Sequence, residues 1–115
     1  MQDTVILVTR LGLGWTDGAD SEFGVEMLDK LFHTLERQPS KPKAICFYTE
    51  GVKAVVKGSP FEVGLKLLAG LGVRLVVCET CVKYYGLDDQ LAVGEVGGMP
   101  DIVKLMSEAG KVITV

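Results

Sequence analysis

Four short runs of mainly apolar residues are spaced along the chain. The first three runs have the pattern of strands in a parallel sheet that is covered on both faces, so that neither face meets water, and the last run, KVITV, closes the chain as a fourth strand. The runs are rich in β-branched residues and end at glycine, proline or charged residues. They predict strands over residues 4–9, 43–48, 73–78 and 111–115. We expect the first of them, TVILVT, to be a central strand.

Between these strands, apolar residues recur at the spacing that lines one face of a helix. The strongest set begins at Asp20 or Ser21, either of which could cap the first turn. Proline at a first helical position marks the start of two other helices. The predicted helices cover residues 20–37, 60–70, 79–86 and 100–110. Strands that alternate with helices predict an α/β fold, a Rossmann-like open parallel sheet with helices on both faces in three layers.

The length of 115 residues suits one domain, residues 1–115, with a substantial core. No apolar run approaches the roughly 20 residues that a membrane helix requires. The first residues lack the positive start, apolar middle and small-residue cleavage site of a secretory signal. We therefore expect a cytoplasmic protein without a membrane partner.

The formal net charge is -3, from 12 lysine and arginine residues against 15 aspartate and glutamate residues. The basic residues are scattered and form no stripe along any predicted element. Neutralising phosphates with clustered basic residues supplies most of the affinity for nucleic acid. Nucleic acid is thus not an expected partner.

Cys78 and Cys81 lie three residues apart, where the third predicted strand gives way to a short helix. Ligands of open α/β sheets gather beyond the carboxyl ends of the strands. The amides at the start of a helix favour the thiolate, which is the nucleophilic form of cysteine. The position therefore suits a reactive Cys78.

Three other interpretations of this pair stay open. The spacing permits a thiol-disulfide pair, in which the second thiol resolves a disulfide formed by the first. It also permits half of a zinc site, but Cys46 and His33 are isolated, so we expect no metal. Free cysteine is often buried, so both thiols could simply fill the strand-to-helix junction, as we expect for Cys46.

Two glycine-rich loops are expected near the same sheet edge. LGLGWTDG, residues 11–18, lacks the glycine spacing of a dinucleotide loop and the lysine of a phosphate loop. VGEVGGMP, residues 93–100, could close over the thiol or form an ordinary turn. The candidate lining residues of a pocket here are Gly12, Trp15, Asp17, Lys83, Tyr85, Gly97 and Gly98.

The order and spacing of these segments resemble the DsrE/DsrF-like sulfur-transfer family. GVRLVVCETCVKYYGL carries the likeness most clearly, with a β-branched strand that ends in cysteine, a second cysteine and a following Gly-Leu. VILVTRLGLGWTDGADSEFGVEMLDKLFHTL and LAVGEVGGMPDIVKLMSEAGKVITV agree with it. The sequence is especially similar to the C-terminal domain of the YedF group, over about residues 3–115.

This resemblance implies a DsrE-like fold, a homo-oligomer such as a trimer, dimer or hexamer, and a cysteine that carries sulfane sulfur as a persulfide. Cys78 matches the sulfur-carrying position, and Cys81 matches a second cysteine found in only part of the family. Members of the YedF group typically carry a TusA-like domain before this one. A separate TusA-like protein is therefore an expected sulfur donor or acceptor, and no cofactor is implied.

Our first hypothesis is thus a sulfurtransferase or sulfur-relay protein that uses Cys78, with Cys81 assisting or resolving. The alternative is a non-catalytic oligomeric module that binds a small molecule or a partner in a strand-end pocket. A third possibility is a dithiol oxidoreductase that uses Cys78 and Cys81. The reactivity of Cys78 distinguishes the first hypothesis from the second.

Overall fold

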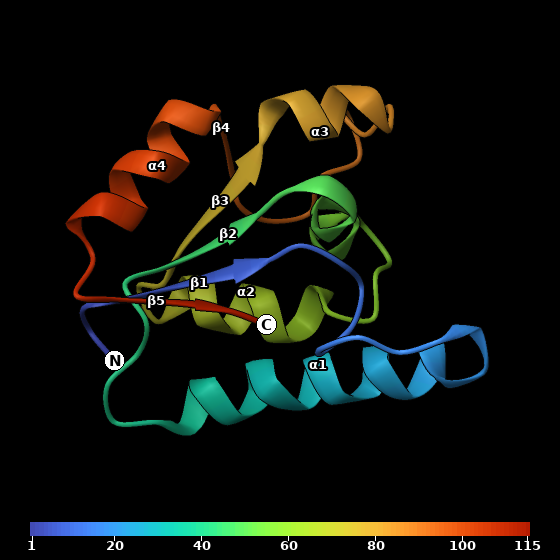
Figure 1. Cartoon of the computed structure of the whole chain (residues 1–115), viewed down its shortest axis with the longest axis horizontal. Coiled ribbons are helices and arrows are strands. Elements are labelled where there is room, and N and C mark those ends of the chain that lie inside the picture. The colour runs from blue at the N-terminus through green and yellow to red at the C-terminus, as the bar shows by residue number, and fades with distance from the viewer.

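The computed structural model describes all residues, 1–115, and centres on a five-stranded parallel sheet (Figure 1). The strand order is β4-β3-β2-β1-β5. Four of the strands fall within the predicted apolar runs, and the fifth, β4, does not. The strands are β1 (Thr4–Val8), β2 (Ala44–Phe47), β3 (Arg74–Cys78), β4 (Glu95–Gly97) and β5 (Lys111–Thr114).

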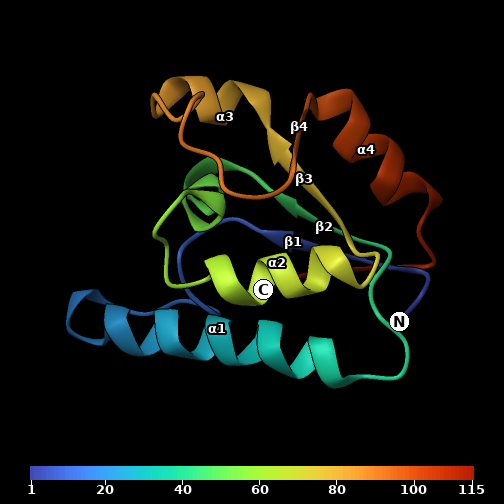
Figure 2. The same cartoon turned by 180° about the vertical axis from the view of Figure 1, so that it is seen from behind.

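Helices cover both faces of this sheet, which confirms the predicted α/β architecture. They are α1 (Ser21–Arg37), α2 (Glu62–Gly70), α3 (Glu79–Tyr84) and α4 (Met99–Glu108), with 3-10 helices η1 (Gly18–Asp20) and η2 (Thr49–Val55). The helices α1 and α2 lie side by side on one face, and α4 lies on the other (Figure 1 and Figure 2). The short α3 continues from β3 beyond the carboxyl edge of the sheet.

The core lies between the sheet and its helices. Every residue of β1 and β2 is buried, as expected for strands covered on both faces. Phe32 of α1 meets Phe61 edge to face, with ring centroids 5.7 Å apart, and both side chains are fully buried. Burying each ring stabilises the fold by about 1.5 to 3 kcal/mol. The packed core thereby fixes the positions at which β1, β2 and β3 end.

One expectation about the sheet needs correction. The sequence predicts a cover over the thiol or an ordinary turn for residues 93–100, but Glu95–Gly97 is an edge strand that pairs with β3. Its three residues are too few and too exposed to show a strand pattern, with Val96 50% exposed. The expectation of a central first strand is confirmed, since β1 lies inside the sheet between β2 and β5 and all of its residues are buried.

The predicted caps are only partly present. Neither Asp20 nor Ser21 caps α1 with its side chain; η1 precedes the helix, and the Ser21 hydroxyl donates to the Gly18 carbonyl at 3.0 Å. Ser59 does act at the start of the second helix, since its Oγ accepts the Phe61 N–H at 3.0 Å. None of the four α-helices combines the length and the apolar character needed to cross a bilayer.

Candidate functional site

The two predicted cysteines lie at the carboxyl edge of the sheet, where β1, β2 and β3 end side by side. Cys78 is the last residue of β3, and Cys81 lies in the first turn of α3. Cys78 is 2% exposed and Cys81 is half-buried, and both thiols are free. Cys81 is thus the outer member of the pair.

The Cys81 sulfur has two polar neighbours. The Thr49 N–H donates to Cys81 Sγ at 3.0 Å. Burial raises the pKa of the Cys81 thiol, hydrogen bonding with Cys78 raises it further, and the Thr49 N–H opposes both effects. The net shift is upward, so Cys81 stays a neutral thiol to higher pH than an ordinary cysteine.

Thr49 holds this N–H in place through a strained backbone. Its φ of 50° lies in the left-handed region, which a β-branched residue adopts rarely and at a cost of about 1 to 3 kcal/mol. Its hydroxyl lies 2.8 Å from the Thr9 carbonyl oxygen and 2.7 Å from the Tyr48 carbonyl oxygen, so it links the ends of β1 and β2. Sequence reasoning missed Thr49, since nothing local marks a threonine with positive φ.

We expect Thr49→Val to lower the free energy of unfolding by about 1 to 3 kcal/mol. Valine keeps the β-branch that opposes the left-handed conformation and loses the hydroxyl that offsets it. Thr49→Gly is the matched control, because glycine adopts positive φ without steric cost and should lose less stability. Urea denaturation measures both, and an equal or larger loss for glycine would contradict this account of Thr49.

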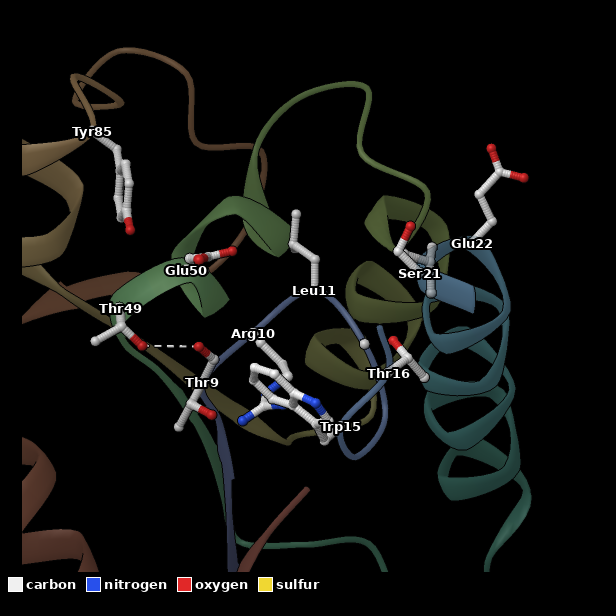
Figure 3. Close-up of a pocket in the computed structure, with 12 residues that line it drawn as sticks. Thr9, Arg10, Leu11, Trp15, Thr16, Ser21, Glu22, Thr49, Glu50 and Tyr85 are labelled. Atoms are coloured by element: carbon white, nitrogen blue, oxygen red, sulfur yellow. Dashed lines mark hydrogen bonds between the residues drawn. The ribbon is translucent and has the colours of Figure 1, made fainter. Parts of the chain in front are cut away.

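A cavity of about 600 Å³ opens beside Thr49 (Figure 3). It lies beyond the ends of β1 and β2, between the loop after β1, the start of α1 and the end of α3. Three of the predicted pocket residues, Gly12, Trp15 and Tyr85, line it. Gly12 is buried against Gly24 of α1, and a Cβ at Gly12 would lie 3.4 Å from the Gly24 carbonyl carbon. This close approach fixes the loop against the helix.

Two cation–π contacts shape the walls of the cavity. The Arg10 guanidinium lies 4.5 Å from the centre of the Trp15 ring, and Figure 3 shows the two side chains stacked. Across the cavity, Lys53 Nζ lies 4.4 Å from the centre of the Tyr85 ring. Desolvation and the nearby Glu50 carboxylate raise the pKa of Tyr85, so its phenol stays a neutral hydrogen-bond donor.

The other predicted pocket residues lie elsewhere. Asp17 is exposed ahead of η1, and Lys83 is exposed and paired with Glu79 at 3.0 Å. Gly97 stands opposite Cys78 in the β3–β4 register, and the Gly98 N–H donates to Asp101 Oδ2 at 2.9 Å. The two glycine-rich loops are therefore not two walls of one pocket: one lines the cavity, and the other flanks Cys78.

The remaining titratable candidates belong to the packing of the fold. Cys46 is fully buried in β2, and desolvation raises its pKa from 9.0 to about 11, which leaves it inert at neutral pH. His33 lies on α1 between Asp29 and Glu36, at 3.5 Å and 3.3 Å. No group of three or more histidine, cysteine, aspartate or glutamate side chains is arranged to hold a metal ion.

Comparison with known proteins gives a family and a fold. The model of the DsrE/DsrF-like family matches residues 24–115. The YchN protein of E. coli superposes with a TM-score of 0.70 at 20% identity, over 100% of both chains. MTH1491 of Methanobacterium thermoautotrophicum, a protein of unknown function, superposes with a TM-score of 0.71 at 22% identity, over 97% of both chains.

A third solved structure, the conserved protein of unknown function BT1422 from Bacteroides thetaiotaomicron, has a TM-score of 0.65 and 15% identity. It covers 98% of this chain and 95% of its own. At such identities the three structures establish the fold alone. No curated protein matches the sequence significantly.

Proposed function

The chain belongs to the DsrE/DsrF-like family, whose members generally work in sulfur relay, and on this basis we propose that it carries sulfane sulfur as a persulfide on Cys78. The observation that carries the proposal is the adjacency of two free thiols at the carboxyl edge of the sheet, beside a cavity. The family predicted from the sequence is confirmed. The finer likeness to the YedF group stays a prediction.

The transfer is an exchange between a thiolate and a persulfide. The Cys78 thiolate attacks the outer sulfur of a donor persulfide, R–S–SH. The new bond forms between Cys78 Sγ and that sulfur, the donor S–S bond breaks, and R–S⁻ leaves. Cys78 then holds –S–SH, and the reverse exchange passes the sulfur to an acceptor thiolate. No external oxidant or reductant is required.

Burial supports Cys78 as the site that stores the sulfur. At 2% exposure, a persulfide on Cys78 is shielded from reductants in solution. The same burial means that the incoming sulfur reaches Cys78 only when a side chain next to it moves. Cys81 is the outer thiol of the pair, so we propose that the donor approaches past it.

Cys81 also decides how long the persulfide lasts. A Cys81 thiolate can attack the inner sulfur on Cys78, which forms the Cys78–Cys81 disulfide and expels HS⁻. This discharge requires the deprotonated thiol, and the raised pKa keeps Cys81 protonated near neutral pH. The protein is thus better suited to carry sulfur than to release it as sulfide.

We expect the loaded protein to release sulfide faster as the pH rises, because Cys81 ionises. The rise should begin at a higher pH than for an ordinary cysteine, since the pKa of Cys81 is raised. Sulfide measured after removal of the donor gives the rate. The control is Cys81→Ser, which should lose the pH-dependent release, and release that persists in this variant would contradict the assignment.

Mass spectrometry of the reduced protein after brief exposure to polysulfide tests the proposed function. A gain of one or more sulfur atoms, located on the peptide that contains Cys78, supports a sulfur carrier. An unmodified protein whose Cys78 alkylates no faster than an ordinary thiol would contradict it and favour the binding module. A reversible Cys78–Cys81 disulfide without sulfur gain would favour the dithiol oxidoreductase.

A further inference from the structure

Three charged side chains, Arg10, Glu22 and Glu50, line the cavity beside the thiol pair, and none of them forms a salt bridge. Figure 3 shows the Glu22 carboxylate directed away from the other two, so Arg10 and Glu50 are the opposite charges that a bound molecule would meet. Arg10 makes one long hydrogen bond, from Nη1 to the Gly14 carbonyl oxygen at 3.4 Å, and has no carboxylate within 4.0 Å. Glu50 likewise makes no salt bridge, although both side chains line the cavity. A ligand that carries both an anionic and a cationic group would therefore complete the pairing of both residues.

The rest of the lining suits a small polar molecule. Four residues with hydroxyl groups, Thr9, Thr16, Ser21 and Thr49, line the cavity together with the apolar Leu11 and Val25. The Ser21 and Thr49 hydroxyls donate to the Gly18 and Thr9 carbonyls, so they can only accept a hydrogen bond from a bound molecule. The volume of about 600 Å³ lies within the range of about 300 to 1,000 Å³ that is usual for small-molecule sites. An amino acid or a short peptide fits this volume with room for water.

The cavity and the thiol pair share two wall residues. Thr49 lines the cavity and also donates its N–H to Cys81 Sγ at 3.0 Å. Tyr85 lines the cavity, and its backbone N–H donates to the Cys81 carbonyl oxygen at 3.1 Å. A ligand held between Arg10 and Glu50 can therefore extend a sulfur-bearing side chain toward Cys81, the outer thiol, past which the sulfur reaches the buried Cys78.

We infer that this cavity binds a small zwitterionic persulfide, an amino acid or short peptide whose thiol carries a sulfane sulfur. Its carboxylate pairs with Arg10 and its ammonium with Glu50. The inference rests on the proposed function, and it identifies a class of donor for it. In the transfer step the Cys78 thiolate takes the outer sulfur, the ligand S–S bond breaks, and the ligand leaves as its thiolate.

The only tryptophan of the chain, Trp15, lines the cavity and reports on binding directly. S-methylcysteine is a suitable probe, because it has the two charges and no transferable sulfur. Titration should change the Trp15 fluorescence in a saturable way. Analogues that lack the ammonium, 3-(methylthio)propanoate, or the carboxylate, S-methylcysteamine, should bind about 10- to 100-fold more weakly, the usual effect of losing one charged hydrogen-bonded pair.

Variants assign each charge to its residue. Arg10→Gln should lower the affinity for S-methylcysteine about 10-fold or more, and this variant should bind the analogue without a carboxylate about as well as S-methylcysteine. Glu50→Gln should lower the affinity by a similar factor, and it should bind the analogue without an ammonium about as well as S-methylcysteine. Arg37→Gln is the matched control, since Arg37 is exposed at the end of α1, outside the cavity. S-methylglutathione, compared with S-methylcysteine, distinguishes a peptide from an amino acid.

The two proposals fail in different ways. Equal affinity for the zwitterion and both singly charged analogues, or no saturable change in fluorescence, would overturn the zwitterion site even if polysulfide still loads Cys78. Saturable, charge-dependent binding without any sulfur gain on Cys78 would uphold the site and overturn the sulfur carrier. Faster loading from cysteine persulfide than from its singly charged analogues supports both.

Discussion

Replacing Cys78 with serine is expected to abolish persulfide loading, whereas the Cys81→Ser variant should still load. Serine has no thiolate with which to accept a sulfane sulfur, and the hydroxyl is close in size to the thiol it replaces. Cys81 remains in the Cys78→Ser variant, and so does its burial, the largest cause of its raised pKa, so little Cys81 thiolate is available near neutral pH. The expected loss in Cys78→Ser is therefore nearly complete.

The Cys81→Ser variant should hold its sulfur longer than the wild type. Without the second thiol, the Cys78 persulfide cannot collapse to an internal disulfide and expel sulfide. Mass spectra taken at intervals after removal of the donor give both the extent of loading and its decay. The decay should slow in the variant most clearly at alkaline pH, where Cys81 ionises in the wild type.

Cys46 provides an internal control for this series. It remains in every variant, it is fully buried, and its pKa is raised to about 11. Polysulfide should reach Cys46 only in molecules that have unfolded. Sulfur on Cys46 would therefore show that the labelling comes from an unfolded fraction of the sample. Stable loading of Cys78→Ser on Cys81 would reverse the roles proposed for the two cysteines.

The sequence predicted the buried strands and α1 because their apolar periodicity is continuous and local. The predicted range 20–37 differs from the observed Ser21–Arg37 by one residue, and 73–78 differs from Arg74–Cys78 by one. Helix α1 carries apolar residues on one face over 17 residues, which is enough to set its bounds. The edge strand β4 has three residues and only β3 as a neighbour, so its pairing is not visible locally.

The site was less predictable, because it is formed by contacts between residues that are far apart in the sequence. The hydrogen bond from Thr49 to Cys81 spans 32 positions, and the left-handed turn at Thr49 has no sequence signal. Trp15 lines the cavity while Asp17, two residues away, does not. The loop's packing on α1 at Gly12 determines which side chains point inward, and no pattern within residues 11–18 reveals this.

Gly51→Ala is expected to lower the free energy of unfolding by about 3 kcal/mol or more, the upper range for overpacking a core. A Cβ at Gly51 would lie 2.1 Å from the Val8 carbonyl oxygen and 2.7 Å from the Val8 carbonyl carbon. Both are backbone atoms of the buried β1, so no side chain can rotate to make room. The backbone of η2 or the end of β1 has to move instead.

That movement would reach the site, because Gly51 is two residues from Thr49. It would strain the hydrogen bonds from Gly51 N–H to the Tyr48 carbonyl at 3.0 Å and from Tyr48 N–H to the Val8 carbonyl at 3.2 Å. These bonds set the turn that aims the Thr49 N–H at Cys81. We therefore expect the remaining folded Gly51→Ala protein to load sulfur poorly and to bind zwitterionic probes more weakly at Trp15.

Gly70→Ala is the matched control for Gly51→Ala. A Cβ at Gly70 would meet no atom within 4 Å, and alanine favours helix over glycine by about 1 kcal/mol, so this variant should be as stable as the wild type or slightly more so. Urea denaturation of the two variants gives the comparison. If Gly51→Ala were as stable as Gly70→Ala, the backbone of the turn after β2 would have to move without a cost in stability. Thr49, which lies in that turn, could then not be the fixed hydrogen-bond donor on which the thiol site depends.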